Sequence, residues 1–174
     1  IAILEVHDVT GKDDTSLLET AADYWIEVKE ALIGKENYVI LNIANEWVGN
    51  WDGQKWCDGY TSVIPRLREA GIKNTIIVDA AGWGQYGQSV TDYGEQVFAA
   101  DPDANTMFSV HMYGTAGKNK ATIARNLKLS TDKGLCMIVG EFGWNHSDGD
   151  VDEEYILEYC NENSVGWLAW SWKG

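Results

Sequence analysis

Cysteine is scarce in this chain, with three copies among 174 residues. Cys57, Cys136 and Cys160 are too few and too irregularly spaced for a disulfide framework or a structural zinc site. We therefore expect buried or half-buried thiols, with a bridge between Cys136 and Cys160 as the alternative. The chain has 174 residues, and 45% of them are hydrophobic. It is therefore long and apolar enough for one domain with its own core.

Basic residues and long apolar runs are also lacking. The chain has 13 Lys and Arg residues and 27 Asp and Glu residues, which gives a net charge of −14 spread along the chain. Such a surface repels phosphate backbones and anionic lipid headgroups. No apolar run approaches the roughly 20 residues that span a bilayer, and no basic stretch followed by an apolar segment opens the chain. We expect neither nucleic acid nor a membrane as a partner, and the acidity favours a secreted, extracellular protein.

Tryptophan and tyrosine, by contrast, are abundant, with nine and eight copies. Exposed aromatic rings are costly unless a ligand with apolar faces covers them, and sugars have such faces. Trp25 falls on the apolar stripe of a predicted helix and is expected in the core. Six other tryptophans follow predicted strands, and at least half of them should line a groove: Trp47, Trp51, Trp83, Trp144, Trp170 and Trp172.

Six short apolar runs predict β-strands, and helical apolar patterns lie between them. The predicted strands cover residues 2–7, 39–44, 75–80, 106–112, 135–140 and 166–171, and the predicted helices about 16–33, 63–70, 93–100, 121–133 and 150–159. Most of the strands are continuously apolar, which is typical of parallel strands covered on both faces. Ser16 and Glu19 have the spacing of a capping box, and Pro65 is expected near the start or a kink of the second helix.

The alternation of strand and helix predicts the α/β class. A doubly wound sheet would carry a Gly-rich phosphate loop after its first strand, and residues 9–14 lack those glycines. We therefore favour a (β/α)8 TIM barrel in a single domain over residues 1–174. A complete barrel takes about 250 residues, so we expect strands 3 to 8 here, with the first two βα units and the last helix missing. A missing N-terminal segment or another chain is expected to cover the open edges of such a truncated barrel.

Reactive side chains follow these strands, at the end of a barrel where active sites lie. Glu46 and Glu141 directly follow apolar strands, where an unpaired charge is costly. Glycoside cleavage needs one carboxyl group to protonate the departing oxygen and a second to attack or to activate water. We interpret the two glutamates as this pair rather than as members of separate structural ion pairs. The other strand-end groups are His7, Asn45, Asp79, His111 and Tyr113.

The histidines leave two alternatives open. His7, His111 and Tyr113 are either functional groups or hydrogen-bonded core residues. A ring of His and Glu also suits a divalent metal ion. The spacings His-x-His and His-x-x-x-His are absent, however, and a tryptophan-rich mouth suits a sugar rather than a metal. We therefore expect no metal and no other cofactor.

Several segments together resemble the motifs of glycoside hydrolase family 5. They are residues 43–47 (IANEW), 111–113 (HMY), 139–143 (VGEFG) and 167–174 (WLAWSWKG). Residues 78–85, 101–102 and 149–153 are similar to bacterial endo-β-1,4-mannanases of that family. The resemblance runs through the whole chain in motif order. It implies a barrel enzyme that acts on a β-1,4-linked polysaccharide such as mannan, glucomannan or cellulose.

The resemblance also implies the roles of residues in a retaining double displacement, with the two carboxyl groups about 5 to 5.5 Å apart. Glu46 would be the proton donor and Glu141 the nucleophile. Asn45 would bind the 2-hydroxyl of the sugar at the cleavage point, and Tyr113 would hydrogen-bond Glu141 and keep it ionised. The remaining substrate-binding residues would be His7, Trp83, His111 and Trp170. An arginine that family members carry on the second barrel strand has no counterpart in this chain.

Two other functions stay open beside an endo-β-1,4-mannanase. An endo-β-1,4-glucanase would use the same groups, because the two substrates differ only at the C2 hydroxyl. A catalytically impaired carbohydrate-binding fragment would keep the aromatic groove without turnover. The preference for mannan rests on the resemblance alone.

Overall fold

Six parallel strands form one sheet, and their order in the sheet is their order along the chain. The computed structural model describes residues 1–171. The strands are β1 (Ala2–Glu5), β2 (Val39–Asn42), β3 (Ile76–Asp79), β4 (Thr106–Met112), β5 (Met137–Phe142) and β8 (Gly166–Trp167). Every neighbouring pair is parallel. The sheet has β1 and β8 as its edges, and within residues 1–171 no further strand pairs with either one.

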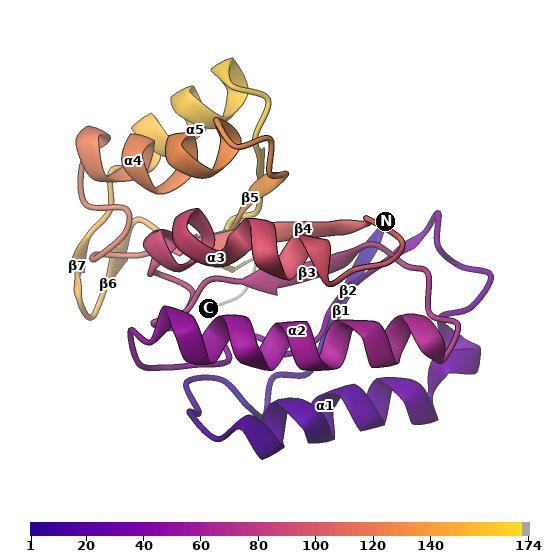
Figure 1. The fold of residues 1–174 in the computed structure, drawn as a ribbon. Helices are drawn as coiled ribbons and strands as arrows, with labels where there is room; N and C mark the ends of the chain where they lie inside the picture. The colour runs from indigo at the N-terminus through magenta and orange to yellow at the C-terminus, as the bar shows by residue number, and fades with distance from the viewer. Residues whose placement is uncertain (172–174) are drawn as a thin grey trace.

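Five α-helices lie along one face of the curved sheet (Figure 1). They are α1 (Thr15–Glu27), α2 (Gly53–Glu69), α3 (Gly87–Ala99), α4 (Lys120–Thr131) and α5 (Glu153–Glu162), and a 3-10 turn η1 (Lys29–Ala31) follows α1. Each helix packs against the next along the chain. Among these described helices, none has the length and apolar character of a bilayer-crossing segment. The arrangement is that of consecutive βα units in a barrel that does not close.

Side chains of the strands alternate between two environments, as the strand period of two requires. Leu41, Val78 and Phe108 point outward and are fully buried in the core that the sheet shares with the helices. The inner face carries polar side chains and Gly140 beside a few apolar ones, and these residues line the barrel interior: Asn42, Asp79, Ser109, His111 and Gly140, with Ile3, Ile77 and Leu168. The apolar core therefore supports the sheet from outside, and the polar groups face the open side.

The pairing of β4 with β5 shifts by one residue near the carboxyl ends of these strands. Val110 pairs with Val139, but His111 pairs with Glu141, so Gly140 is an extra residue in β5. A side chain at position 140 would collide with Ser109 Oγ, and glycine avoids that collision. A β-bulge of this kind re-aims the side chain that follows it. In this chain it places Glu141 beside His111.

The predicted start of the first helix is wrong in its capping residue. Asp14, not Ser16, is the N-cap of α1, and its Oδ1 accepts a hydrogen bond from Ser16 N at 2.9 Å. The predicted box with Glu19 does not form because the chain is already helical at Thr15. Aspartate serves equally well as a cap, and sequence spacing alone does not separate two candidate caps that lie two residues apart.

Other predicted boundaries also differ from the structure, and α3 begins at Gly87 instead of about residue 93. α2 begins at Gly53, about ten residues before the predicted start, and Pro65 lies inside it rather than at its start. Trp56 and Tyr60 on its first turns are fully buried, but Gly53 and Gly59 interrupt the apolar period. β8 ends at Trp167 instead of residue 171, although Trp170 N still donates to Phe142 O at 2.8 Å.

All three cysteines are free thiols, so the alternative of a bridge between Cys136 and Cys160 is wrong. Cys57 and Cys160 are buried, as expected, whereas Cys136 is exposed. Burial raises the pKa of Cys160 to about 11, which leaves its thiol protonated and unreactive at neutral pH.

A buried ion pair connects the end of α2 with the loop after α3. Arg68 donates from Nε and Nη2 to the two carboxylate oxygens of Asp101, at 2.8 and 2.9 Å, and neither side chain is more than 2% exposed. Thr106 Oγ1 also donates to Asp101, at 2.7 Å. Burial alone would raise the pKa of Asp101, but the hydrogen bonds from Arg68 and Thr106 outweigh it and lower the pKa to about 2.

Asp101→Ala is expected to lower the free energy of unfolding by about 3 to 5 kcal/mol, because it leaves the Arg68 charge buried without its partner. Since the folded pKa of Asp101 lies below its unfolded value of about 3.9, this stabilisation is present above pH 4 and is lost as the pH falls towards 2. Urea unfolding followed by tryptophan fluorescence measures the change. Asp103→Ala is the matched control, because Asp103 lies 3.8 Å from Arg68 Nε and is 37% exposed. Equal losses in the two variants would contradict the prediction.

Candidate active site

The carboxyl ends of the strands open into a cleft of about 850 Å³. Two of its lining residues are the glutamates that the sequence singles out, Glu46 after β2 and Glu141 near the end of β5. Five further predicted site residues line the same cleft: His7, Asn45, Trp83, Tyr113 and Trp170. His111 lies beneath it, in the adjoining cavity of the barrel interior. The structure therefore brings all eight predicted residues together.

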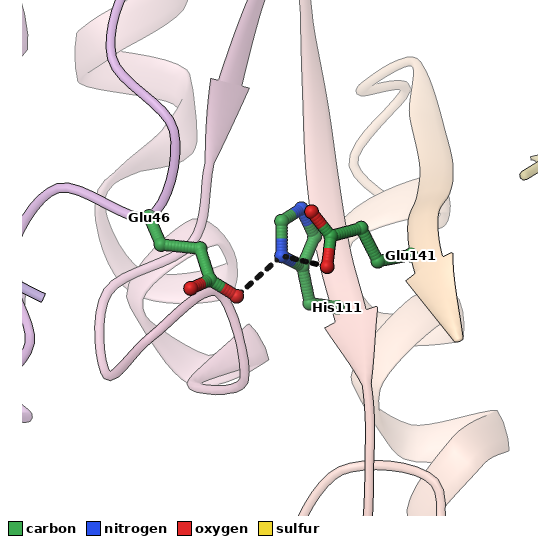
Figure 2. Close-up of side chains that lie close together, drawn as sticks. All are labelled: Glu46, His111 and Glu141. Carbon is green, nitrogen blue, oxygen red and sulfur yellow. Dashed lines mark hydrogen bonds and ion pairs between the residues drawn. The ribbon is translucent and has the colours of Figure 1, made fainter. Parts of the chain in front are cut away.

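Glu46, His111 and Glu141 form the centre of this site (Figure 2). His111 Nδ1 lies 2.7 Å from Glu46 Oε1, within hydrogen-bond distance, and 3.7 Å from Glu141 Oε2. One oxygen of each carboxylate and a ring nitrogen of His111 lie within 4.8 Å of one another. All three residues are buried, with 9% or less of their surface exposed. Two carboxyl groups thus face each other across one imidazole in a site of low solvent access.

The backbone at Glu46 adopts an uncommon conformation. Its φ is 49°, in the left-handed region that non-glycine residues rarely enter. The Glu46 N–H donates to Asp79 Oδ2 at 3.0 Å, and Asn45 N donates to Val6 O at 2.9 Å. Strain of this kind persists only where surrounding contacts hold it, and it is typical of functional sites. The turn directs the Glu46 side chain toward the cleft instead of along the strand.

Asp79 is the buried group that sequence reasoning placed at a strand end without giving it a role. Its Oδ2 accepts from Asn42 Nδ2 at 2.8 Å and from Glu46 N, and its Oδ1 lies 3.3 Å from His111 Nε2. The last contact is an ion pair whose geometry falls short of a hydrogen bond. Burial would raise the pKa of Asp79, but the His111 charge outweighs it and the pKa is lowered. The sequence indicated this buried group only by placing a carboxylate directly after an apolar strand.

His111 is held as a cation by the acidic groups around it. Burial alone would lower the pKa of His111, but the charge of Asp79 and the hydrogen bond to Glu46 raise it well above its usual value. An imidazolium has no free lone pair to offer a metal ion. The three groups Glu46, His111 and Glu141 have the composition of a divalent-cation site, and a cation bound there would have to displace the proton of His111. The absence of a metal cofactor stays a prediction.

Tyr113 makes the hydrogen bond to Glu141 that the sequence resemblance implies. Its hydroxyl donates to Glu141 Oε2 at 2.6 Å. Burial raises the pKa of Glu141, while the His111 charge and the Tyr113 hydrogen bond act in the opposite direction, and the net shift is upward. Tyr113 thus favours the ionised form of a carboxyl group that burial pushes toward the neutral form.

Tyr113→Phe is expected to lower kcat/KM for a β-1,4-linked polysaccharide by about 10- to 100-fold, because it removes one hydrogen bond to a charged group. Removal of the donor raises the pKa of Glu141, and a nucleophile has to be ionised. The acidic limb of the pH profile should therefore move to higher pH. A kcat/KM profile between pH 4 and 9 measures both effects, with the exposed Tyr38→Phe as the control. An unchanged acidic limb would contradict this role.

Four of the six strand-end tryptophans line the cleft, in line with the expectation of at least half. They are Trp51, Trp83, Trp144 and Trp170, and each is about half or more exposed. Trp47 does not line it; the ring is fully buried against Tyr60, and its Nε1 donates to Asp14 O at 3.1 Å. Trp25 is in the core, as predicted. Trp172 lies outside the described residues.

Local contacts fix the cleft-lining residues His7, Asn45 and Trp83. His7 is not a core residue, because its side chain is 55% exposed. Its ring is stacked on that of Trp170, with the ring centroids 6.3 Å apart. Asn45 is buried, donates to Thr10 Oγ1 at 3.0 Å, and keeps Oδ1 without a partner among residues 1–171. Trp83 lies between Gly82 and Gly84, and all three have a positive φ. A side chain at Gly84 would meet the His111 ring, so glycine allows this turn to approach His111.

A β/α-barrel sheet that carries two buried glutamates and a tryptophan-lined cleft at its carboxyl end defines the class of β/α-barrel glycoside hydrolases. The sequence matches the model of the Cellulase (glycosyl hydrolase family 5) family over residues 1–174. This chain belongs to glycosyl hydrolase family 5. The predicted (β/α)8 fold is confirmed, with the chain covering part of such a barrel.

Bacterial mannanases are prominent among the similar proteins. The chain is 60% identical to a mannan endo-1,4-beta-mannosidase of Salipaludibacillus agaradhaerens, across all of this chain and 56% of that protein. It is 44% identical to a mannan endo-1,4-beta-mannosidase of Streptomyces lividans, across all of this chain and 46% of that protein. The chain thus spans about half the length of these relatives.

The similar solved structures also include bacterial β-mannanases. The β-mannanase of Streptomyces thermolilacinus superposes with a TM-score of 0.91 at 40% identity, over 99% of this chain and 59% of that one. A mannohexaose complex of the Thermomonospora fusca β-mannanase superposes with a TM-score of 0.88 at 40% identity, over 99% of this chain and 58% of that one. A Thermobifida fusca endoglucanase catalytic domain gives 0.75 at 25% identity, over 98% of this chain and 56% of that one. Likeness to mannanases is therefore greater than likeness to that endoglucanase.

Proposed function

We propose that this chain carries the catalytic site of a retaining endo-β-1,4-mannanase. The observation that carries the proposal is the placement of Glu46 and Glu141, with oxygens within 4.8 Å of each other and of a His111 nitrogen. Inverting enzymes keep their carboxyl groups about 6.5 to 9.5 Å apart to admit a water molecule, and retaining enzymes about 5 to 5.5 Å. The short separation supports direct attack on the sugar by one carboxylate.

In the proposed mechanism Glu141 attacks the anomeric carbon while Glu46 gives a proton to the departing glycosidic oxygen. A covalent glycosyl ester on Glu141 results. Glu46, now ionised, then removes a proton from water, and the hydroxide displaces Glu141 from the sugar with a second inversion. His111 Nδ1, 2.7 Å from Glu46 Oε1, stabilises the carboxylate that Glu46 becomes.

Substrate binding is assigned to the groups that surround this pair. Asn45 Oδ1, free of a partner among the described residues, is available to a sugar hydroxyl. The exposed faces of Trp83 and Trp170 suit the apolar faces of pyranose rings. His7 supports Trp170 through its stacked ring. An extracellular location is part of the proposal, because the polymer is too large to enter a cell and the net charge of −14 suits a secreted protein.

Mannan is preferred over cellulose because of the relatives at 60% and 44% identity. An endo-β-1,4-glucanase is the second candidate, since a protein of Caldicellulosiruptor saccharolyticus described as beta-mannanase/endoglucanase A is 44% identical over 99% of this chain and 13% of that protein. Both activities would use the same two glutamates.

The two candidates are separated by reducing-sugar release from galactomannan and from carboxymethylcellulose, measured on the complete gene product. We expect release from galactomannan with a rapid fall in viscosity, because an endo-acting enzyme cuts within the chain. Activity on carboxymethylcellulose alone would refute the mannanase assignment. Proton NMR of the first product tests the stereochemistry: a new β-anomer supports retention, and a new α-anomer would refute it.

A further inference from the structure

Asp148 joins three loops at the rim of the cleft. It lies in the turn of the hairpin formed by β6 (Asn145–His146) and β7 (Gly149–Asp150). Its Oδ1 accepts from Gly114 N at 3.0 Å and lies 2.6 Å from His146 Nδ1. Its Oδ2 accepts from Thr115 N at 2.8 Å, from Thr115 Oγ1 at 2.9 Å and from Gln85 Nε2 at 3.1 Å. These partners belong to the loops that follow β3, β4 and β5.

These hydrogen bonds keep Asp148 ionised. Burial would raise its pKa, but the bonds from His146, Thr115 and Gln85 outweigh burial and hold the pKa well below the usual range. Hydrogen bonds to a charged acceptor are about twice as strong as neutral ones. One carboxylate thus connects the three loops that follow β3, β4 and β5. Within residues 1–171, these loops are not joined to one another by strand pairing.

The backbone around the hairpin is closely packed at the same place. A side chain at Gly114 would collide with the backbone of Asp148 and Gly149, so glycine permits the contact. Asp152 N donates to Gly117 O at 2.9 Å at the far end of the hairpin. The hairpin is therefore docked on the loop after β4 and forms one wall of the cleft, with His146 and Asp148 among its lining residues.

A chain of contacts leads from Asp148 to the proposed nucleophile. His146, bound to Asp148, lies over the Tyr113 ring with ring centroids 4.4 Å apart and planes inclined by 30°. Tyr113 in turn donates its hydroxyl to Glu141 at 2.6 Å. Movement of the hairpin would remove the ring that packs on Tyr113 and would loosen the hydrogen bond to Glu141.

We propose that Asp148 is a positioning residue that fixes the hairpin and, through His146 and Tyr113, the hydrogen bond that Tyr113 donates to Glu141. This inference rests on the proposed function for its kinetic consequences, but not for its effect on the pKa of Glu141. Asp148 itself does not touch the reacting atoms. Its influence has to appear through Tyr113.

The test is a double-mutant cycle between Asp148→Ala and Tyr113→Phe in the complete gene product. Asp148→Ala alone is expected to lower kcat by about tenfold and to move the acidic limb to higher pH, as Tyr113→Phe does. In the Tyr113→Phe background, the same substitution should lower kcat by less than about threefold. Equal losses in the two backgrounds would overturn the proposal, as would a change confined to KM.

A second measurement keeps the test independent of turnover. The 13C shift of the Glu141 carboxyl carbon, followed against pH, reports its pKa directly. Removing the negative charge of Asp148 would by itself lower that pKa, whereas losing the Tyr113 hydrogen bond raises it. We expect a rise in Asp148→Ala; a fall or no change overturns the positioning role. A protein without hydrolytic activity would refute the proposed function and leave this measurement valid.

Two variants control for simple unfolding. Asp148→Asn keeps one carbonyl oxygen for Gly114 N and should retain the fold if Asp148→Ala does not. It is expected to raise the pKa of Glu141 less than the alanine variant. Asp150→Asn, on the same hairpin but with no side-chain hydrogen bond among the described residues, should leave kcat and the pH profile unchanged. A kcat loss in Asp150→Asn equal to that in Asp148→Ala would show that any change in the hairpin has the effect, and would overturn the proposal.

Discussion

Glu141→Gln is expected to reduce turnover of galactomannan by at least about 10⁴-fold while leaving the affinity for mannohexaose within about threefold of the wild type. The amide keeps the size of the carboxylate but has no charge with which to attack the anomeric carbon. It can still accept the hydrogen bond from Tyr113. Reducing-sugar assays measure turnover, and isothermal titration calorimetry measures binding.

Glu19→Gln is the matched control, because Glu19 is an exposed carboxylate on α1, remote from the cleft, and should behave as the wild type. Residual turnover above about 1% in Glu141→Gln would mean that another group is the nucleophile. A wild-type protein that binds mannohexaose but hydrolyses nothing would instead support the carbohydrate-binding alternative.

Glu46→Gln should show an effect that depends on the leaving group. With galactomannan, whose leaving sugar needs a proton, we expect a fall in kcat of about 10²- to 10⁴-fold. With 2,4-dinitrophenyl β-mannobioside the leaving phenolate needs no proton, so the first step stays fast. The second step lacks its base, and the glycosyl-enzyme accumulates.

Stopped-flow absorbance should then record a burst of dinitrophenolate that approaches one equivalent per site. Azide, a nucleophile that needs no general base, should accelerate the slow phase and give a β-glycosyl azide. Glu141→Gln provides the contrast, because without the nucleophile there is neither burst nor azide rescue of this kind. Equal slowing of Glu46→Gln on both substrates, with no burst, would remove Glu46 from the acid/base role.

The strands of the barrel could be predicted because a buried parallel strand needs a continuous apolar run. β4 matches its predicted bounds, and the other strands lie within or beside theirs. The start of α2 could not be found, because Gly53 and Gly59 interrupt the apolar period and the cap at Asp52 is one of several candidates. β6 and β7 have two residues each, too few for any period to show.

The site was predictable to the extent that strand ends define it. Glu46, His111 and Glu141 converge because parallel strands end at the same edge of the sheet. The role of Asp79 was not predictable, since its partners Asn42 and His111 come from other strands and their register is a property of the folded sheet. Trp47 turns inward because the positive φ of Glu46 and Val48 reverses the chain there, and no apolar pattern encodes that reversal.

The extra residue in β5 has a consequence for protein engineering and for evolution. Gly140 acts as a one-residue spacer between the part of β5 that packs against the helices and the carboxylate at its end. Deleting it would remove the bulge and leave Glu141 opposite His111 in a regular ladder, without the local bend that aims its carboxylate toward the Tyr113 hydroxyl. The position of the Glu141 carboxylate is therefore set by an inserted residue in β5 and not by the type of side chain at any one position. Libraries built from substitutions alone would leave that variable unsampled, whereas single-codon deletions and insertions in residues 139–141 would explore it directly.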